Sequence, residues 1–430
     1  MLHMGSSYRQ MLIELRNHAH LAGSFGLAMA DEVLAQLRLR VLCLGGEVWM
    51  LDAATLLVNI PDDLLWGEAK ASERLVEDWM EHWQLWLSTP VTLHRGGLRV
   101  LPVVGLSRAF NVADARDAHA CNADARACAP DRWELELSPL DEVQFIAPPG
   151  RGMKWREAYA RDMACAIDLY EHLAAGELSL DMQPVVRTRD HSEVLYLEAL
   201  LRLSKPGAKE AAGPGPAAGT ASISMGDKVP ALERLGLVRE LDRVVVLSVL
   251  RWLRAQPMAC VGCNVSALSL VGDSWWSSVI AQLRERPDIA SRLTIEITET
   301  AAQYDPGVAT AFVHRLQALG CRIALDDFGA GHSSFAFMQS VQPQVTKLDG
   351  SLIRAARGSR SGEQRLTSLA AYCQAIAEHV VAEGIEQPQD VDRASRVGAD
   401  CLQGFAIAPP APMTPRLWLA SGDEFLARAR

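Results

Sequence analysis

The stretch 322–334, with the sequence RIALDDFGAGHSS, indicates how the second half of this chain is built. It begins with a short apolar run, which is typical of a buried strand, and continues with the paired acids Asp326 and Asp327. Neighbouring side chains on a regular strand face opposite sides, so both aspartates can serve one site only if the strand ends there. The glycine-rich sequence that follows predicts such an end.

Seven other segments have the same layout of an apolar run with polar residues at or near its end. With the first, the set is LSLDMQPVV (178–186), EVLYLEALL (193–201), ACVGCNVS (259–266), LTIEITE (293–299), RIALDD (322–327), VTKLD (345–349), HVVAEGIE (379–386) and CLQGFAI (401–407). Helical stretches separate most of them, and a helix at 155–176 precedes them. This α/β alternation predicts a (β/α)₈ barrel of about 250 residues.

The polar residues at these strand ends are of a few chemical kinds. They are Glu198, Asn264, Glu296, Asp326, Asp327, Lys347, Asp349, Glu383 and Glu386. In a (β/α)₈ barrel such strand ends converge on one face, which holds the active site. Crowded carboxylates repel one another unless cations neutralise them. Because the donors are hard oxygens, we expect magnesium or manganese and not zinc or copper.

A plainer interpretation exists for each acid alone. A single acidic residue after a strand is usually a solvated loop residue or a helix cap. That interpretation does not extend well to nine residues on consecutive elements. Two divalent cations about 4 Å apart could instead clamp a phosphodiester and activate a water. Lys347 would add a positive charge for the water or the phosphate.

The motifs LEALLRL, CNVS, IEITET, LDDFGAGHSS, TKLD, VVAEGIE and LQGF occur in this order. Together they resemble the signature of EAL-type cyclic di-GMP phosphodiesterases, over about residues 160–415. The resemblance implies a TIM-like barrel that hydrolyses cyclic di-GMP to linear pGpG in bacterial second-messenger signalling. It also implies two divalent cations, Mg²⁺ or Mn²⁺.

By the same resemblance, individual residues receive roles. Glu198, Asn264, Glu296 and Asp326 would bind the first metal, and Asp326, Asp327 and Glu383 the second. Lys347 would contact the catalytic water, Asp349 would orient Lys347, and Glu299 would hold the loop after Asp327. Gln183 and Arg202 would contact substrate, Gln403 would position water, and Glu386 would support the second-metal side.

Three departures from the family pattern stand out. Gln344 occupies a position that is usually Asp, and the last strand continues as FAIAPPAP. A Gly-, Ala- and Pro-rich segment follows the EALL strand from Ser204. Its composition predicts a loop without a core of its own, so deletion of residues 207–218 should leave the fold intact.

The N-terminal hundred residues resemble, weakly but in order, a GGDEF (diguanylate cyclase) domain. The resemblance lies in 12–41, in the hairpin VWMLDAATLLVNI (48–60) and in LRVLPVVGLSRA (98–109). The GGDEF motif itself is replaced by Asp52-Ala-Ala-Thr-Leu56, and Glu14, Ala22 and Gly23 stand where the family has its metal-binding and base-contacting residues. We therefore expect no cyclase activity. The expected domains are 1–145, a linker at 146–158, and the barrel at 159–430.

Composition narrows the class of protein. The chain has 430 residues, 49% of them hydrophobic, and a formal net charge of −10. That charge argues against binding to long nucleic acid. No apolar run is long enough for a membrane span, and the start lacks a signal-peptide pattern, so we expect a cytoplasmic protein. The nine cysteines are scattered, which favours reduced thiols.

Two rival functions remain at this stage. A nonhydrolysing cyclic di-GMP receptor would bind the nucleotide without turnover, although such receptors usually lack metal ligands. A protein-interaction domain would bind no nucleotide, with or without metal. The resemblance also suggests a homodimer through the barrel domain.

Overall fold

The computed structural model describes residues 8–43, 45–61, 83, 86–94, 97–106, 110–112, 153–203, 223–225, 228–272, 274–298, 306–330 and 335–413. Several sequence predictions lie outside these residues. They are the Gly/Ala/Pro-rich segment with its deletion at 207–218, residues 146–152 of the expected linker, and the role of Glu299.

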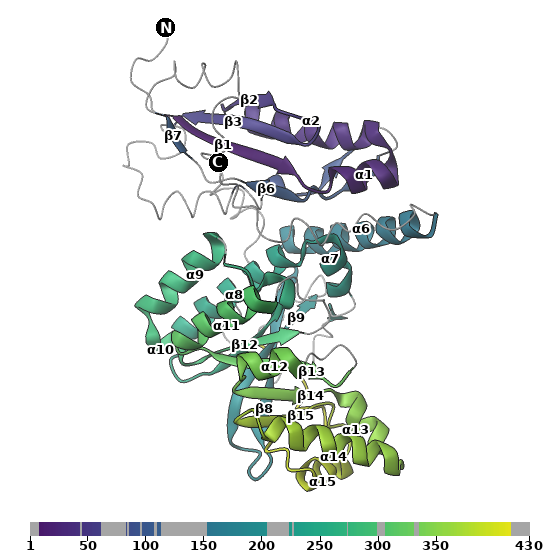
Figure 1. Cartoon of the computed structure of the whole chain (residues 1–430), viewed down its shortest axis with the longest axis vertical. Coiled ribbons are helices and arrows are strands. Elements are labelled where there is room, and N and C mark those ends of the chain that lie inside the picture. Colours follow the sequence, from purple (N-terminus) through teal and green to yellow (C-terminus); the bar gives the residue numbers. More distant parts are fainter. Residues whose placement is uncertain are drawn as a thin grey trace, which may run out of the picture.

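In the part of the N-terminal unit that the structure describes, a small sheet packs with the helices α1 and α2 (Figure 1). Its elements are β1 (Tyr8–Leu15), α1 (His18–Phe25), α2 (Leu27–Cys43), β2 (Glu47–Met50), β3 (Thr55–Pro61), β4 (Val91–Thr92), β5 (Arg99–Val100), β6 (Val104–Leu106) and β7 (Phe110–Val112). The strand order is β2-β3-β1-β6, with β7 also paired to β1. The hairpin expected at 48–60 is β2–β3, whereas 98–109 holds two short strands and not one.

The C-terminal part is a closed barrel. Its strands are β8 (Leu178–Arg187), β9 (Val194–Leu203), β11 (Val261–Ser266), β12 (Leu293–Thr298), β13 (Arg322–Phe328), β14 (Val345–Leu348), β15 (His379–Ala382) and β16 (Cys401–Leu402). Pairing runs through them in the order β9-β11-β12-β13-β14-β15-β16-β8, and β8 pairs with β9 to close the ring. The predicted barrel is therefore confirmed, with every predicted strand segment in place.

One strand departs from a regular (β/α)₈ barrel. β8 runs antiparallel to both β9 and β16. The reason is local, because β8 and β9 are joined by the short turn at 188–193 and form a hairpin. A parallel connection would need a crossover of a dozen or more residues.

Helices surround the barrel, and short elements complete it. They are α6 (Met153–Ala174), α7 (Val229–Leu235), α8 (Val238–Ala255), η3 (Ala267–Ser269), α9 (Ser274–Glu285), α10 (Pro287–Ala290), α11 (Pro306–Ala318), α12 (Phe335–Val341), α13 (Gly350–Ala356), α14 (Arg360–Gln374), α15 (Pro388–Arg396), β10 (Ile223–Ser224) and β17 (Ala411–Pro412). Trp276 of α9 is fully buried against Phe312, with ring centroids 4.8 Å apart, so it packs the core.

The barrel interior has a small apolar layer of its own, formed by Val185, Leu195, Tyr196, Ala324, Val345, Val381 and Cys401. Side chains two positions apart on a strand share a face. Six of these seven residues are each two positions from a predicted site residue: Gln183, Glu198, Asp326, Lys347, Glu383 and Gln403. The alternation therefore sends all six polar side chains into the barrel, on one side of the apolar layer.

Helix α6 connects the two parts of the molecule (Figure 1). It begins at Met153, within the stretch given above as linker. Asn17, after β1, is fully buried; it donates to Leu101 O at 2.9 Å and to the Tyr159 hydroxyl of α6 at 3.5 Å. The other end of α6 reaches the barrel helices, where the Tyr170 hydroxyl donates to Leu237 O at 3.5 Å.

Among the described helices, none is both long enough and apolar enough to cross a bilayer.

Candidate metal centre

Two groups of acidic side chains meet at the C-terminal ends of the parallel strands. Glu198, Glu296 and Asp326 form one trio, with one ligand oxygen from each lying within 4.8 Å of the others. Asp326, Asp327 and Glu383 form a second trio on the same criterion. Asp326 belongs to both, so the two groups are adjoining halves of one site.

The backbone of β13 lets both aspartates serve this site. The glycine-rich sequence predicts that the strand ends after Asp327, but β13 continues to Phe328. Its pairing with β14 instead shifts register between Leu325 and Phe328, and Asp327 has a φ of 54°. This bulge and left-handed residue turn Asp327 toward the side of Asp326.

Lys347 lies at the centre of the acidic group. Its Nζ is 2.7 Å from Glu296, 2.8 Å from Glu383, 2.9 Å from Glu198 and 3.0 Å from Asp326. Its side chain is 1% exposed. Burial alone would lower the pKa of Lys347, but the surrounding carboxylates hold that pKa well above its usual value. The lysine is therefore charged at neutral pH.

The carboxylates are protonated to different degrees when no cation is bound. Burial and the charge of Glu198 raise the pKa of Glu296 well above its usual range. Burial also raises the pKa of Glu383, and it raises that of Asp327 to about 7. Glu198 differs: burial is outweighed by Lys347 and by hydrogen bonds, so its pKa is lowered. Binding of cations would release these protons.

Hydrogen bonds from three amide side chains hold Glu198 and its neighbours. Asn264 Nδ2 donates to Glu198 Oε1 at 2.7 Å, and Gln403 Nε2 donates to Glu198 Oε2 at 2.6 Å. Gln403 Nε2 also reaches Gln183 Oε1 at 3.3 Å, and Gln183 donates to Ala408 O at 3.1 Å. Because each carboxylate oxygen of Glu198 accepts a hydrogen bond from an amide, the orientation of this side chain is fixed.

The donor set fits hard divalent cations. Asn264 Oδ1 and Glu296 Oε1 are buried, and no hydrogen bond reaches either within the described part of the chain. A buried acceptor without a partner is costly, and a cation would satisfy both. The five carboxylates of the two trios face one ammonium group, which leaves four negative charges when all are ionised. Two divalent cations carry that charge.

Residues 167–410, more than half of the chain, match the family described as EAL domain. This chain belongs to the EAL domain family. The match spans every barrel strand described above, from β8 to β16.

Curated relatives of this EAL domain include cyclic di-GMP phosphodiesterases. PdeB of Shewanella oneidensis is 28% identical over 253 residues, covering 58% of this chain and 28% of the relative. NbdA of Pseudomonas aeruginosa is 29% identical over 273 residues, covering 61% and 32%. The chain thus spans about a third of the length of these relatives. The solved "PaMucR Phosphodiesterase, c-di-GMP complex" is 25% identical, with a TM-score of 0.49, and covers 59% of this chain and 99% of that one.

Other predicted residues lie at the edges of the EAL site. Arg202 is near the rim, with its Nε 3.7 Å from Asp181 Oδ2. Asp349 caps α13 by accepting from Ser351 N at 2.9 Å. Its charge helps to raise the pKa of Asp327, so it lies near the second trio, while its role toward Lys347 stays a prediction.

Glu386 forms ion pairs with Arg354 and Arg357, which belong to neither trio. It is exposed, and its Oε2 accepts from Arg357 Nη2 at 3.0 Å. Arg357 also binds the buried Asp390, which completes a capping box at the start of α15. In this structure Glu386 thus joins α13 to the loop before α15, and its support of the second-metal side stays a prediction.

Gln344, where the family usually has Asp, lies at the far end of β14. Its Oε1 accepts from Ile323 N at 2.9 Å, and its backbone carbonyl accepts from His379 N at 3.0 Å. Gln344 therefore links β13, β14 and β15 at the base of the EAL barrel, and its contacts do not involve the acidic trios.

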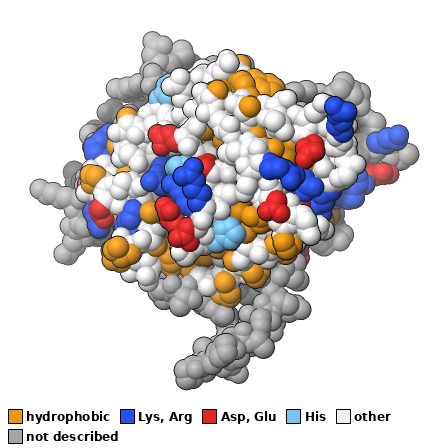
Figure 2. All heavy atoms as spheres, turned by 90° about the horizontal axis from the view of Figure 1, so that it is seen from below, with side chains coloured by type: hydrophobic (Ala, Val, Ile, Leu, Met, Phe, Trp, Pro, Cys, Tyr) orange, Lys and Arg blue, Asp and Glu red, His pale blue; other side chains and the backbone are white. Residues whose placement is uncertain are grey.

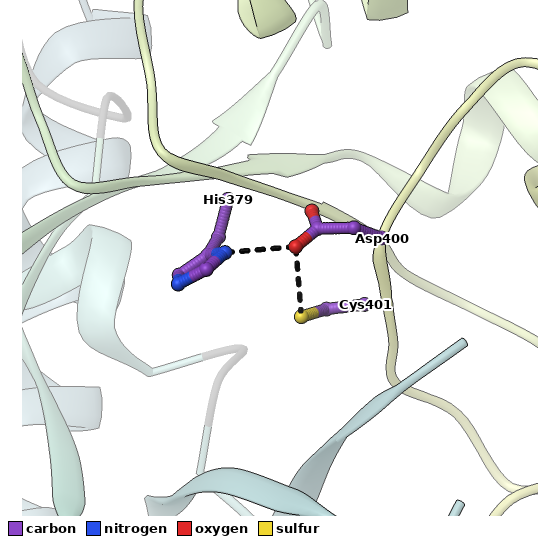
Figure 3. A group of neighbouring side chains, drawn as sticks. All are labelled: His379, Asp400 and Cys401. Carbon is purple, nitrogen blue, oxygen red and sulfur yellow. Dashed lines mark hydrogen bonds and ion pairs between the residues drawn. The ribbon is translucent and has the colours of Figure 1, made fainter. Parts of the chain in front are cut away.

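A third group of potential ligand side chains lies at that base, and Arg187 contacts it. His379, Asp400 and Cys401 lie together at the starts of β15 and β16 (Figure 3). Arg187 Nη1 is 2.9 Å from both His379 Nδ1 and Asp400 Oδ2, and 3.6 Å from Cys401 Sγ. Because the guanidinium already neutralises this group, we interpret it as a structural link between β8, β15 and β16.

Sequence reasoning missed two interior residues of the EAL barrel. Asp181 lies two positions before Gln183 and therefore shares a strand face with it. This spacing in the sequence could have indicated that Asp181 also points into the barrel. Gly262 lies two positions before Asn264, and a Cβ there would meet the Glu296 carboxylate and lie 2.7 Å from Tyr196 Cε2. Only a residue without a side chain leaves room for Glu296.

Gly262→Ala should therefore weaken cation binding. The added methyl must displace Glu296 or Tyr196, both essentially buried, and overpacking of this kind costs about 1–3 kcal/mol. We expect an affinity for Mn²⁺ about 10–100-fold lower, as for other changes next to metal ligands. Titration with Mn²⁺ measures it. Gly272→Ala is the control, since nothing lies within 4 Å of its Cβ position; equal affinities in the two variants would contradict the crowding argument.

Proposed function

We propose that this chain hydrolyses one phosphodiester bond of cyclic di-GMP and gives linear pGpG, using two divalent cations. The observation that carries the proposal is the pair of acidic trios sharing Asp326 in an EAL barrel. The named relatives support the substrate, since several are cyclic di-GMP phosphodiesterases. Mg²⁺ or Mn²⁺ suits the oxygen-only donor set.

The roles of the residues follow from their positions. Glu198, Asn264, Glu296 and Asp326 would hold one cation, and Asp326, Asp327 and Glu383 the other. Such cations lower the pKa of a bound water and stabilise the oxygens of the phosphodiester.

The remaining polar residues would act on the protein side of the reaction. Lys347, which contacts both trios, would hold the attacking water. Gln403 and Asn264 keep Glu198 in one orientation through their hydrogen bonds. Arg202 at the rim would attract a phosphate of the substrate.

The decisive test is an assay with purified protein, Mg²⁺ or Mn²⁺, and cyclic di-GMP, with pGpG measured by chromatography. We expect product formation that EDTA abolishes and excess Mn²⁺ restores. The control is Glu198→Ala, which removes a member of the first trio. If the intact chain makes no more pGpG than this variant, it is not a phosphodiesterase. Binding without turnover would then point to a receptor.

We further propose that residues 1–145 are a degenerate GGDEF-like domain, followed by a linker at 146–158 and the barrel at 159–430. The hairpin β2–β3 supports this, because its turn holds Asp52, Ala53 and Ala54 where the family has its motif. The Asp52 carboxylate accepts from Ala54 N at 2.8 Å within the turn. Incubation with GTP should yield no cyclic di-GMP.

Other partners follow from the proposal and from the charge. On the face shown in Figure 2, acidic side chains of the described residues lie among the basic ones. This supports the expectation that long nucleic acid is not a partner. A homodimer through the barrel domain and a location in the cytoplasm stay predictions.

A further inference from the structure

A separate pair of buried acids lies outside the metal centre, on helices α7 and α8 and against the end of β11. It consists of Glu233 on α7 and Asp242 on α8, which are 7% and 6% exposed. Neither belongs to the two trios. Buried carboxylates are rare unless they are paired or hydrogen-bonded, so their partners indicate what they do.

Both carboxylates bind the end of β11. Asp242 Oδ2 accepts from the backbone N–H of Ser266 at 3.0 Å and from the Ser269 hydroxyl at 2.6 Å. Glu233 Oε1 accepts from the Ser266 hydroxyl at 2.7 Å. Ser269 O in turn accepts from Trp276 Nε1 at 2.6 Å. The serines are 3% and 1% exposed, so water does not compete for these bonds.

Ser266 and Ser269, which these carboxylates bind, lie close in the chain to the proposed metal ligand Asn264. Ser266 is two positions after Asn264, and in the parallel pair β11–β12 it lies beside Thr298. Asn264 lies beside Glu296, two residue pairs earlier in the same register. The end of β11 thus sets the height of Asn264 in the barrel and its distance from the first trio.

We propose that Asp242 is a positioning residue for the metal centre: by holding Ser266 and Ser269 from α8, it fixes β11 so that Asn264 presents its carbonyl to the first cation. This inference rests on the proposed function. Along α8, Val246, Val249 and Leu253 continue the face that carries Asp242, and all three are fully buried. The carboxylate is thus held on a rigid helix, which is what accurate positioning of a ligand requires.

The test measures Mn²⁺ binding directly, by electron paramagnetic resonance, in the full chain. Asp242→Asn should raise the free Mn²⁺ concentration at half-saturation about tenfold, the lower end of the effect of changes around metal ligands. Ser269→Ala should also raise the free Mn²⁺ concentration at half-saturation. In the double variant this concentration should be no higher than in Asp242→Asn. At saturating Mn²⁺ the kcat for cyclic di-GMP should return to near the wild-type value, because the ligands themselves are intact.

Asp288→Asn is the matched control, since Asp288 is exposed and pairs with Arg286 at 2.9 Å. A lower melting temperature with unchanged half-saturation in Asp242→Asn and Ser269→Ala would overturn the positioning role alone. If Asp242→Asn does not fold, Ser269→Ala decides in the same way. Wild-type protein that binds no Mn²⁺ would overturn the proposed function together with this inference.

Discussion

Asp326→Asn should abolish hydrolysis of cyclic di-GMP more completely than the loss of any other single ligand. Asp326 is the residue common to both trios, and asparagine keeps its size while removing its charge. Metal-based stabilisation of a phosphodiester transition state is worth several kcal/mol, so we expect kcat to fall on the order of 10³-fold or more. The amount of pGpG formed per unit time at saturating Mn²⁺ measures it.

The number of bound ions gives an independent measure of the shared position. Glu296→Gln touches only the first trio and Asp327→Asn only the second, so each should lose one Mn²⁺ per chain. Asp326→Asn should lower the affinity for both Mn²⁺ ions, and Asp288→Asn should change the affinity for neither. If Asp326→Asn binds Mn²⁺ as well as Asp327→Asn does, Asp326 does not join the two sites.

Lys347→Met should destabilise the protein strongly in EDTA and much less with Mg²⁺. The ammonium group is the partner of four carboxylates, three of them buried, and removal of one member of a buried ion pair costs about 3–5 kcal/mol. Bound cations would replace the lost charge, so the rise in melting temperature on adding Mg²⁺ should be larger than in the wild type. Turnover should fall about 100-fold or more, because in the proposed mechanism the lysine also holds the attacking water.

Lys154→Met provides the control for this prediction. Lys154 is exposed on α6, so its loss should change neither the stability in EDTA nor the response to Mg²⁺. Equal unfolding curves for Lys347→Met and wild type in EDTA would mean that the carboxylates are already protonated and need no internal cation.

The strand pattern predicted much of the candidate site because it depends on two local rules. Side chains two apart share a strand face, and parallel strands end at one mouth of a barrel. These rules are enough to bring Glu198, Glu296, Asp326, Lys347 and Glu383 together. They do not reach residues whose side chains turn after the strand, and Glu386 accordingly lies on the outside with Arg357.

The antiparallel direction of β8 and the bulge at Asp327 could be found only from the folded structure. The direction of β8 depends on how few residues connect it to β9, which the apolar pattern of each strand does not show. The positive φ of Asp327 depends on the pairing of β13 with β14. Asp242 was missed because an acid within a helix gives no signal until the helix is packed against β11.

The amino-acid sequence by itself determined the barrel, through the local periodicity of its strands, and the family, through motifs that occur in the order of the EAL signature. It also placed the candidate oxygen donors at the strand ends. Tertiary structure alone decided that Lys347 contacts four carboxylates, that Gly262 leaves room for Glu296, and that Asp242 binds the end of β11. Those facts depend on distances between side chains far apart in the chain. Such distances are set by the packing of helices on the barrel, which no short segment encodes.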